Sequence, residues 1–244
     1  MFDLHGRVAL VTGAGQHVGA GIARALAAQG ARVAVNDIVA ERAEATASDV
    51  NGEAVAFDVT DLAAVRKGIV EVTERVGPID ILVNNAGNAG AHQMHLVPFR
   101  EMDPSQWSAP IDVNLFGVLN CSHAVIDGMC SRGWGRVITI SSGAGTIGSP
   151  IGVSTYGAGK GGAISFMRHL AIENARTGVT ANTVALGLMQ AGTADATAAL
   201  ARHIPVGRVG SPDDVGAVCV YLASDEASWM TGQTIELNGG LNTT

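Results

Sequence analysis

The sequence predicts an α/β fold: one doubly wound parallel sheet of about seven strands with helices on both faces. Short apolar runs rich in β-branched residues alternate with longer alanine-rich stretches along the whole chain. The apolar runs are nearly continuous rather than interrupted by polar residues, which is typical of strands buried on both faces. Right-handed crossovers between parallel strands then place helices on both sides of the sheet. The expected strands are residues 7–12, 32–36, 54–57, 79–83, 136–140, 179–184 and 234–237.

Six helices are expected between these strands, and two of them carry capping residues at their starts. Asp61 precedes one of these stretches, and Ser211 followed by Pro212 opens another. The stretch 187–208 is rich in small residues and is expected to form a mobile substrate flap with a short helix. Because no linker divides the chain, residues 1–244 are expected to form a single domain. The expected helices are residues 19–29, 41–50, 62–76, 105–131, 155–177 and 212–223.

Composition excludes several classes of protein. The chain has 244 residues, of which 47% are hydrophobic and 15% charged, a balance that excludes intrinsic disorder. Its formal net charge is −7, whereas a nucleic-acid-binding surface needs an excess of basic residues. No uninterrupted apolar run predicts a membrane span, and the first residues lack the pattern of a signal peptide. The three cysteines predict neither a disulfide framework nor a zinc site, and a cytoplasmic location is expected.

A glycine-rich turn joins the first expected strand to the first expected helix. It runs from Thr12 to Gly21 with the sequence TGAGQHVGAG. Glycines in this place let the backbone turn sharply and approach a pyrophosphate, whose charge the helix N-terminus stabilises. A plain strand–helix turn with spare glycines is the alternative, but the flanking strand and helix favour dinucleotide binding. The cofactor-binding residues expected here are Gly13, Gly15, Gln16, His17 and Val18.

The second expected strand leads into an acid, Asp37, which lies 18 residues after Gly19. A carboxylate there can accept hydrogen bonds from both ribose hydroxyls of the adenosine half, and it repels the 2′-phosphate of NADP. No Arg or Lys occupies residues 14–21 or 38–40 to offset that repulsion. Asp37 could instead cap the next segment, but beside the glycine-rich turn it favours NAD(H) as the cofactor.

Four further motifs follow in a fixed order along the chain. NNAG occupies residues 84–87, Asn114 lies within DVNLFG, and Ser142 follows the run ITIS. Tyr156 and Lys160 form a YxxxK motif on the fifth expected helix. Together with the glycine-rich turn, these motifs make the chain resemble the classical short-chain dehydrogenases/reductases over nearly its whole length. The resemblance implies a Rossmann-type fold and an oxidoreductase.

The resemblance also implies four catalytic residues: Asn114, Ser142, Tyr156 and Lys160. Tyr156 would be the general acid/base, and Ser142 would hold the substrate oxygen. A free tyrosine with a pKa near 10 is a poor base, so the Lys160 ammonium and the oxidised nicotinamide are expected to lower the Tyr156 pKa. Asn114 would bend the long helix and hold a water that relays protons. A surface Tyr–Lys pair on an ordinary helix is the alternative, but the four matches together favour catalysis.

Cofactor contacts beyond the glycine-rich turn are implied in the same way. Asp58 and Val59 would line the adenine pocket, Lys160 would bind the nicotinamide ribose, and Leu188 would contact the carboxamide through its backbone. The chain departs from the family at His17, where glycine is usual, so the phosphate loop is expected to be slightly displaced. The further cofactor-binding residues expected are Asp58, Val59, Asn85, Ala86, Gly87, Tyr156, Lys160, Gly187 and Leu188.

The substrate side is expected to come from residues 143–155, residues 187–200 and the loop 88–97. Two histidines in that loop, His92 and His95, either line the substrate or lie incidentally in a solvated turn. They predict no metal site, because no acid lies between them. The substrate-binding residues expected are Ser142, Tyr156, Gly143, His92, Met94 and Met189.

Three functions fit these residues to different degrees. The first is an NAD-dependent alcohol dehydrogenase or ketoreductase acting on a small to medium, fairly apolar secondary alcohol. The second is a 3-oxoacyl-[acyl-carrier-protein] reductase, which ranks lower because an acidic carrier needs a basic rim at the cleft. The third is a non-catalytic dinucleotide-binding regulator, which predicts loss of a catalytic residue although all four are present. The arginines offered to a carrier along the relevant helices are Arg132, Arg136, Arg168 and Arg176.

The expected partners are a small-molecule alcohol or ketone and further copies of the chain. The resemblance implies a homotetramer or homodimer paired through the helices 105–131 and 155–177. Both stretches carry apolar residues beyond one stripe, which fits burial on two sides. No nucleic acid or membrane partner is expected.

Overall fold

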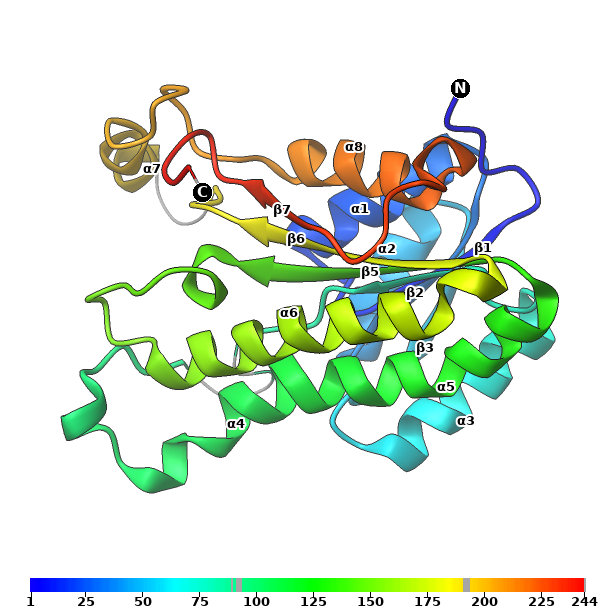
Figure 1. The fold of residues 1–244 in the computed structure, drawn as a ribbon, viewed down its shortest axis with the longest axis horizontal. Coiled ribbons are helices and arrows are strands. Elements are labelled where there is room, and N and C mark those ends of the chain that lie inside the picture. Colours follow the sequence, from blue (N-terminus) through cyan, green and yellow to red (C-terminus); the bar gives the residue numbers. More distant parts are fainter. Residues whose placement is uncertain (89, 91–93, 191–193, 244) are drawn as a thin grey trace.

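The computed structural model describes residues 1–88, 90, 94–190 and 194–243 and contains one parallel sheet (Figure 1). Its seven strands lie in the order β3-β2-β1-β4-β5-β6-β7. From β1 to β3, each new strand is added toward one edge of the sheet, whereas the strands from β4 to β7 are added toward the other edge. The direction of strand addition therefore reverses between β1 and β4. The predicted Rossmann-type, doubly wound α/β fold is thus confirmed. The strands are β1 Val8–Val11, β2 Arg32–Asp37, β3 Glu53–Ala56, β4 Ile81–Asn84, β5 Gly135–Ser142, β6 Val179–Leu186 and β7 Thr234–Leu237.

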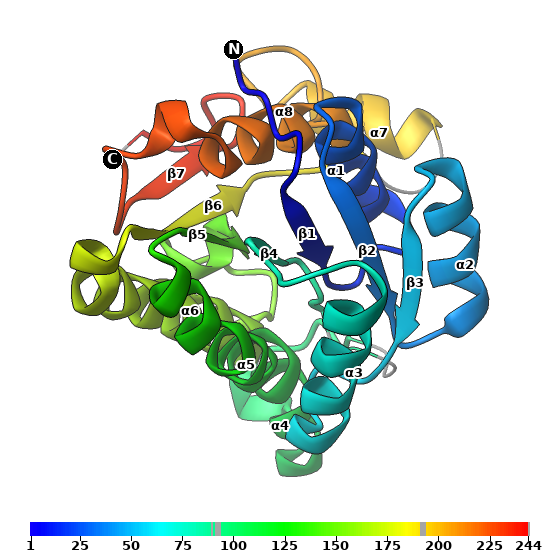
Figure 2. The same ribbon diagram turned by 90° about the vertical axis from the view of Figure 1, so that its right-hand side faces the viewer.

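Helices cover both faces of the sheet, and each layer buries its own apolar core (Figure 2). In one layer, α1 and α8 approach closely through two glycines. A Cβ atom at Gly21 would lie 2.4 Å from Pro212 Cβ, and one at Gly216 would lie 2.7 Å from Ala25 Cβ. This layer holds α1 His17–Ala28, α2 Ala40–Asp49 and α8 Pro212–Ala223; the opposite layer holds α3 Leu62–Arg75, α5 Gly117–Arg132 and α6 Ser154–Asn174.

The expected flap, residues 187–208, lies at the carboxyl edge of the sheet and carries the short helix α7, Ala194–Ala201. Met189 pairs with Gly210 in an isolated parallel bridge, so the two ends of the stretch lie together. Residues 191–193 lie outside the described part of the chain. The mobility of this stretch remains a prediction.

The stretch expected as one helix over residues 105–131 is divided in the structure. A short helix α4, Ser108–Ile111, is followed by a π-helical turn over Asp112–Phe116 and then by α5. Within that turn Asn114 Nδ2 donates to the carbonyls of Pro110, at 2.7 Å, and Asn88, at 2.6 Å. The side chain thus binds a carbonyl that a regular helix would bond through its backbone, which is a known cause of such bends.

The helical stretch Pro104–Arg132 is long and apolar enough to cross a membrane by length and composition, with a mean hydropathy of 1.2. Core helices of globular proteins pass the same test. Here Cys121, Val125 and Met129 are buried in α5, where they belong to the apolar core on one face of the sheet. The stretch is therefore weak evidence for a membrane span.

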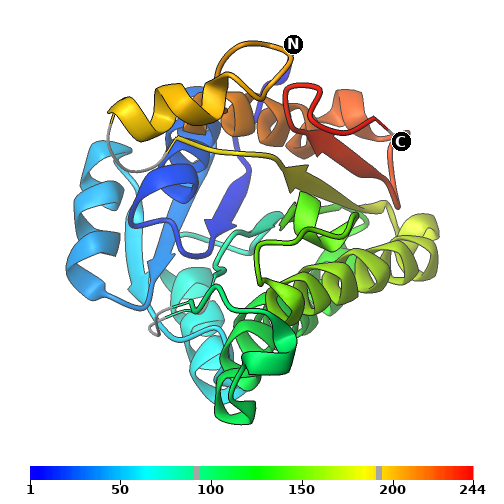
Figure 3. The ribbon, with the colours of Figure 1, turned by 90° about the vertical axis from the view of Figure 1, so that its left-hand side faces the viewer.

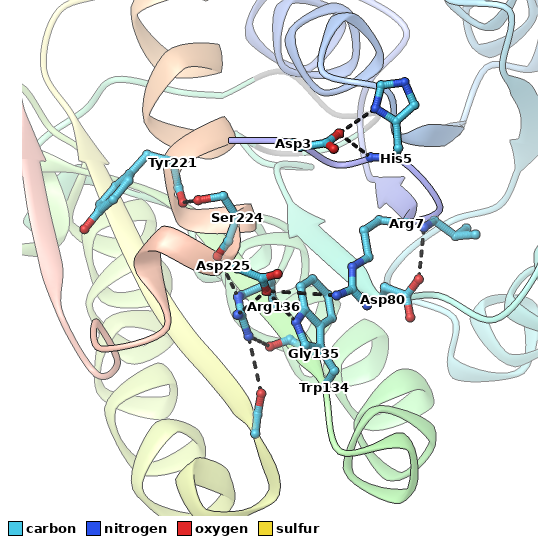
Figure 4. Close-up of polar contacts among 12 residues, drawn as sticks. Asp3, His5, Arg7, Asp80, Trp134, Gly135, Arg136, Tyr221, Ser224 and Asp225 are labelled. Carbon is cyan, nitrogen blue, oxygen red and sulfur yellow. Dashed lines mark hydrogen bonds and ion pairs between the residues drawn. The ribbon is translucent and has the colours of Figure 1, made fainter. Parts of the chain in front are cut away.

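A tryptophan contacted by two arginines fastens the amino edge of the sheet (Figure 4). The guanidinium carbon of Arg7 lies 3.6 Å from the centroid of the Trp134 ring, and that of Arg136 lies 4.3 Å from it. Trp134 Nε1 donates a 2.9 Å hydrogen bond to Asp225 Oδ1. Arg136 is only 2% exposed, and its Nε donates to the carbonyl of Ser224. Cation–π and charge-assisted contacts thus join the start of β1, the start of β5 and the segment after α8.

Trp134→Leu is expected to lower the free energy of unfolding by about 1–2 kcal/mol, because it removes both cation–π contacts and the donor to Asp225. Urea unfolding followed by far-ultraviolet circular dichroism measures the change. Trp229→Leu is a matched control: Trp229 is 99% exposed, so this change should stay within about 0.5 kcal/mol. Equal losses in the two variants would contradict the role of Trp134 as an anchor.

Candidate active site

A cleft of about 690 Å³ opens at the carboxyl edge of the sheet, the edge that faces the viewer in Figure 3. Loops that follow successive strands form its walls on both sides of the point where the sheet order reverses, which is where ligands bind in open α/β sheets. Most of the predicted site residues meet here. They are Gly13, Gln16, His17, Val18, Asp37, Asp58, Val59, Asn85, Ala86, Gly87, Ser142, Tyr156, Lys160, Gly187 and Met189.

The other predicted residues lie beside the cleft or elsewhere. Asn114 is fully buried behind the wall, and Gly15 donates its N–H to Asp37. Met94 lines a second cavity, which shares Tyr156 with the cleft. Gly143 and Leu188 follow residues of the cleft wall but are not part of it, and His92 lies outside the described residues.

The glycine-rich turn brings backbone against backbone, as the sequence predicts. Gly13 has a φ of +59°, and a Cβ atom there would lie 2.8 Å from Ala86 Cα. α1 begins two residues earlier than expected, with Gln16 as its N-cap and no side-chain hydrogen bond to its first turn. The first N–H groups of the helix are therefore left to bind an anion in the cleft.

His17 lies at the position where the family pattern has glycine, and its backbone adopts a conformation that favours glycine. Its φ is +49°, in the left-handed region that a residue with a Cβ atom adopts at a cost of about 1–2 kcal/mol. The turn keeps the conformation of a glycine although histidine occupies it. The imidazole is exposed and lines the cleft beside the N-terminus of α1.

Asp37 is held in place at one end of the cleft. Its Oδ2 accepts the N–H of Gly15 at 3.2 Å, and its Oδ1 accepts the N–H of Val39 at 3.0 Å. The side chain is 5% exposed and still reaches the cleft. Arg42, on the first turn of α2, also lines this end and was missed by the sequence analysis. Arg42 is not among the residues next to Asp37 in sequence; the first turn of α2 brings this cation to the same wall.

Ser142, Tyr156 and Lys160 meet at the opposite end of the cleft. Tyr156 and Lys160 lie one turn apart on α6, and Ser142, the last residue of β5, forms a side-chain hydrogen bond with Tyr156. Lys160 Nζ donates to the carbonyl of Ile140 at 2.7 Å and lies 5.8 Å from the centroid of the Tyr156 ring. The amine is thus fixed between β5 and the phenol ring.

Gly87 lies beside both Lys160 and Asn114. A Cβ atom at Gly87 would lie 3.1 Å from Asn114 Oδ1 and 3.2 Å from Lys160 Nζ, so a larger residue would disturb both groups. Both hydrogens of the Asn114 amide are used, but its Oδ1 is buried and accepts no hydrogen bond within the described part of the chain. This oxygen is thus an acceptor on the same side of Gly87 as the amine.

Burial sets the proton affinities of the two titratable groups. It raises the pKa of the Tyr156 phenol, although the hydrogen bond with Ser142 lowers it in part. It lowers the pKa of Lys160 to about 8, because the apolar surroundings disfavour the ammonium. In the protein alone, burial therefore outweighs the hydrogen bond with Ser142. The lowering of the Tyr156 pKa by Lys160 together with the oxidised nicotinamide stays a prediction.

These residues fit a nicotinamide dinucleotide. The close approach of Gly13 to Ala86 forms the floor of a tight turn at the N-terminus of α1. The Asp37 carboxylate lies at one end of the cleft, and the Tyr156 hydroxyl and Lys160 amine lie at the other. An acid, a helix N-terminus and a proton donor in this order match the adenosine ribose, the pyrophosphate and the nicotinamide half of the cofactor.

A family model described as enoyl-(acyl carrier protein) reductase matches residues 13–242. An acetoacetyl-CoA reductase from Shinella zoogloeoides is 40% identical, over 96% of this chain and 98% of its own. The chain belongs to the classical short-chain dehydrogenase/reductase family. It is therefore an oxidoreductase of a family that binds a nicotinamide dinucleotide.

Other relatives of this short-chain dehydrogenase/reductase bear different names. A 3-oxoacyl-[acyl-carrier-protein] reductase from Vibrio harveyi is 36% identical over 98% of each chain. A solved structure of a gluconate 5-dehydrogenase from Burkholderia cenocepacia, in complex with NADP and tartrate, matches with a TM-score of 0.90 at 35% identity. That match covers 98% of this chain and 96% of the other. The family of the chain is thus established, whereas the names of its relatives refer to different substrates.

Three of the four arginines considered for contact with a carrier protein lie away from the cleft of this short-chain dehydrogenase/reductase. Arg136 is not on a helix but on β5, buried at the amino edge. Arg132 donates to the carbonyl of Ile79 at that same edge, and Arg176 lies in the turn that leads into β6. Arg168 is exposed midway along α6. The placement of Arg136 along a helix was wrong, because it is the second residue of β5.

Metal-binding side chains are dispersed through the described part of the chain. There, no three His, Cys, Asp or Glu side chains come together as a metal centre requires. Cys121, Cys130 and Cys219 are free thiols, and burial raises the pKa of Cys121 and of Cys219 to about 12. These two buried thiols are therefore poor nucleophiles.

The low pKa of Lys160 predicts a pH-dependent difference in stability from Lys160→Met. The amine has a pKa of about 8 in the folded chain and an ordinary value of 10.5. Below pH 8 the Lys160 amine is protonated in both the folded and the unfolded chain, and the folded protein bears the full cost of burying the ammonium. Between pH 8 and about pH 10.5 the amine is neutral in the folded chain but still protonated in the unfolded chain. The free energy of unfolding of the wild type should therefore rise relative to Lys160→Met across this window. Urea unfolding of both proteins at several pH values tests this, and a constant difference would contradict the lowered pKa.

Proposed function

We propose that this chain interconverts a secondary alcohol and a ketone by hydride transfer with NAD(H), with Tyr156 as the general acid/base. The observation that carries the proposal is the meeting of Ser142, Tyr156 and Lys160 at one end of a cleft whose other end fits an adenosine ribose. When bound, the nicotinamide supplies or accepts the hydride. The protein residues position the reacting carbon and move the proton.

In the direction of reduction, Ser142 and Tyr156 would both donate hydrogen bonds to the substrate carbonyl oxygen. The raised pKa of Tyr156 keeps the phenol protonated, which suits a general acid. As the hydride reaches the carbonyl carbon, the phenol proton passes to the oxygen and an alcohol forms. In the reverse direction the phenolate takes the proton back, and the charges of Lys160 and the oxidised nicotinamide favour that phenolate.

Lys160 and Asn114 would return a proton to Tyr156 after each turnover. Lys160 Nζ is already bonded to the carbonyl of Ile140, which leaves its other N–H groups for the cofactor ribose and the relay. The Asn114 Oδ1, which lies on the same side of Gly87 as the Lys160 amine, suits an acceptor for a relaying water. The π-helical turn supports this role because it aims the amide at that spot.

Asp37 favours NAD(H). Two backbone N–H groups hold its carboxylate, so the oxygens can accept hydrogen bonds from ribose hydroxyls without rearrangement, and a 2′-phosphate would meet a negative charge. Arg42 supports NADP(H) as a second candidate. Its side chain is exposed at the same end of the cleft, and within the described residues it forms no ion pair. The solved gluconate 5-dehydrogenase holds NADP.

The proposed substrate is a small to medium ketone or secondary alcohol of modest polarity. A 3-oxoacyl-[acyl-carrier-protein] is the second candidate, supported by the relative from Vibrio harveyi. Three of the four arginines that a carrier would need lie away from the cleft edge, which disfavours an acidic protein partner. A homotetramer or homodimer in the cytoplasm, without nucleic acid or membrane, completes the proposal.

Tyr156→Phe is expected to lower kcat for ketone reduction by a factor of about 10²–10⁴, because it removes the proton donor and keeps the ring. Binding of NADH, followed by its fluorescence, should persist because the rest of the cleft is intact. Unchanged turnover in this variant would falsify the proposed mechanism.

The cofactor preference can be tested by changing each charged group at the adenosine end in turn. Asp37→Ser should raise the ratio of kcat/KM with NADPH to that with NADH at least about tenfold, because it removes a like charge from the 2′-phosphate. If Arg42 binds a 2′-phosphate, Arg42→Ala should lower kcat/KM with NADPH alone. A ratio that Asp37→Ser leaves unaltered contradicts the assignment of Asp37 to the ribose.

A further inference from the structure

A second cavity, of about 290 Å³, adjoins the cleft at Tyr156. Ser108, Ala109 and Tyr156 line both spaces, so they form the neck between them. The volume is at the lower end of the range for small-molecule sites, about 300–1,000 Å³. A ketone whose carbonyl oxygen lies at the Tyr156 hydroxyl therefore has one substituent within reach of this cavity.

The wall of the cavity mixes apolar residues with polar ones. The polar residues include His95, Ser105, Gln106 and Ser108. None of the twelve described residues that line it is Asp, Glu, Lys or Arg. Met102, Pro110 and Val153 supply buried apolar surface. The Thr155 hydroxyl donates to Met102 Sδ at 3.7 Å, so this buried polar group is already satisfied. A carboxylate would find no Lys or Arg among these twelve residues, whereas a short alkyl group would bury apolar surface against Met102, Pro110 and Val153.

The far side of the cavity is closed by contact between two loops. Gly152 has a φ of +76°, and a Cβ atom there would lie 2.5 Å from the backbone N of Val97. The loop before α6 thus packs directly on the loop after β4. Leu96 and Ile151, which flank this contact in sequence, are each 58% exposed. Because only glycine allows this close approach, a larger residue at position 152 would push the two loops apart.

We propose that this second cavity holds the short unbranched alkyl end of the ketone substrate and that Met102 limits its length. The inference rests on the proposed function, because it places the reacting carbonyl at Tyr156. The more polar substituent, such as an ester or thioester, stays in the open cleft beside Met189. The cavity thereby selects alkyl ketones and short 3-oxoacyl esters over sugar acids, although relatives of both kinds are known.

A series of ethyl 3-oxoalkanoates, from 3-oxobutanoate upward, measures the length of the cavity. For the wild type, kcat/KM should peak within the first few members and then fall about tenfold or more for the first chain that no longer fits. Met102→Ala should move that peak to longer chains and raise kcat/KM for the first excluded member about tenfold. Ala109→Leu, at the neck, should lower kcat/KM for every member with more than a terminal methyl group. If Met102→Ala misfolds, the neck variant alone tests the proposal.

Val70→Ala is the matched control, since Val70 is exposed on α3, away from both spaces, and its length profile should equal that of the wild type. The affinity for NADH, measured by fluorescence, separates changes in the cavity from changes in the cleft. If the wild type reduces the series but neither variant alters the length profile, the proposed alkyl site is wrong and the proposed function still holds. A wild type that binds NADH and reduces no ketone contradicts the proposed function, and the alkyl site falls with it.

Discussion

Hydrogen bonds between Thr12 and Asn85 join the two strands at which the sheet order reverses, and the cleft depends on them. Asn85 Nδ2 donates to the carbonyls of Thr12 and Gly13, each at 2.9 Å. Thr12 Oγ1 accepts the N–H groups of Asn85, at 3.0 Å, and Ala86, at 3.1 Å. Backbone groups at these diverging strand ends have no neighbouring strand to bond with, so side chains satisfy them. The same bonds hold the glycine-rich turn against the loop after β4 and so set the floor of the cleft.

At the end of the cleft that holds Tyr156 and Lys160, several groups lower the stability of the fold. A lysine with 5% exposure and an amide oxygen without a donor among the described residues are both costly to bury. The hydrogen bond from Lys160 Nζ to the carbonyl of Ile140 offsets part of the first cost, and Gly87 leaves space beside the Asn114 oxygen. His17 adds a third unfavourable feature, a left-handed backbone without glycine. Departures from good local structure that gather around one cleft are expected where function constrains the fold.

Sequence patterns predicted the sheet, the glycine-rich turn and the edge at which the site lies, because each follows from local periodicity and from the direction of parallel strands. The bend of the long helix at Asn114 was expected only from the family resemblance and not from local periodicity, since it depends on a bond from Asn114 to Asn88, which lies 26 residues away. Arg42 was missed because a helical turn, not adjacency in sequence, places it at the wall. The second cavity depends on how Val97 packs on Gly152, which no local pattern reveals.

The two ends of the chain lie at opposite edges of the sheet (Figure 1). Phe2 packs on Tyr221 and donates its N–H to Glu226, at the amino edge near the Trp134 anchor. Near the other end, Asn242 lies beside Gly143, next to the cleft. A tether or fusion partner attached ahead of Met1 would therefore present the open cleft away from a support, whereas one attached after the last residue would crowd its rim.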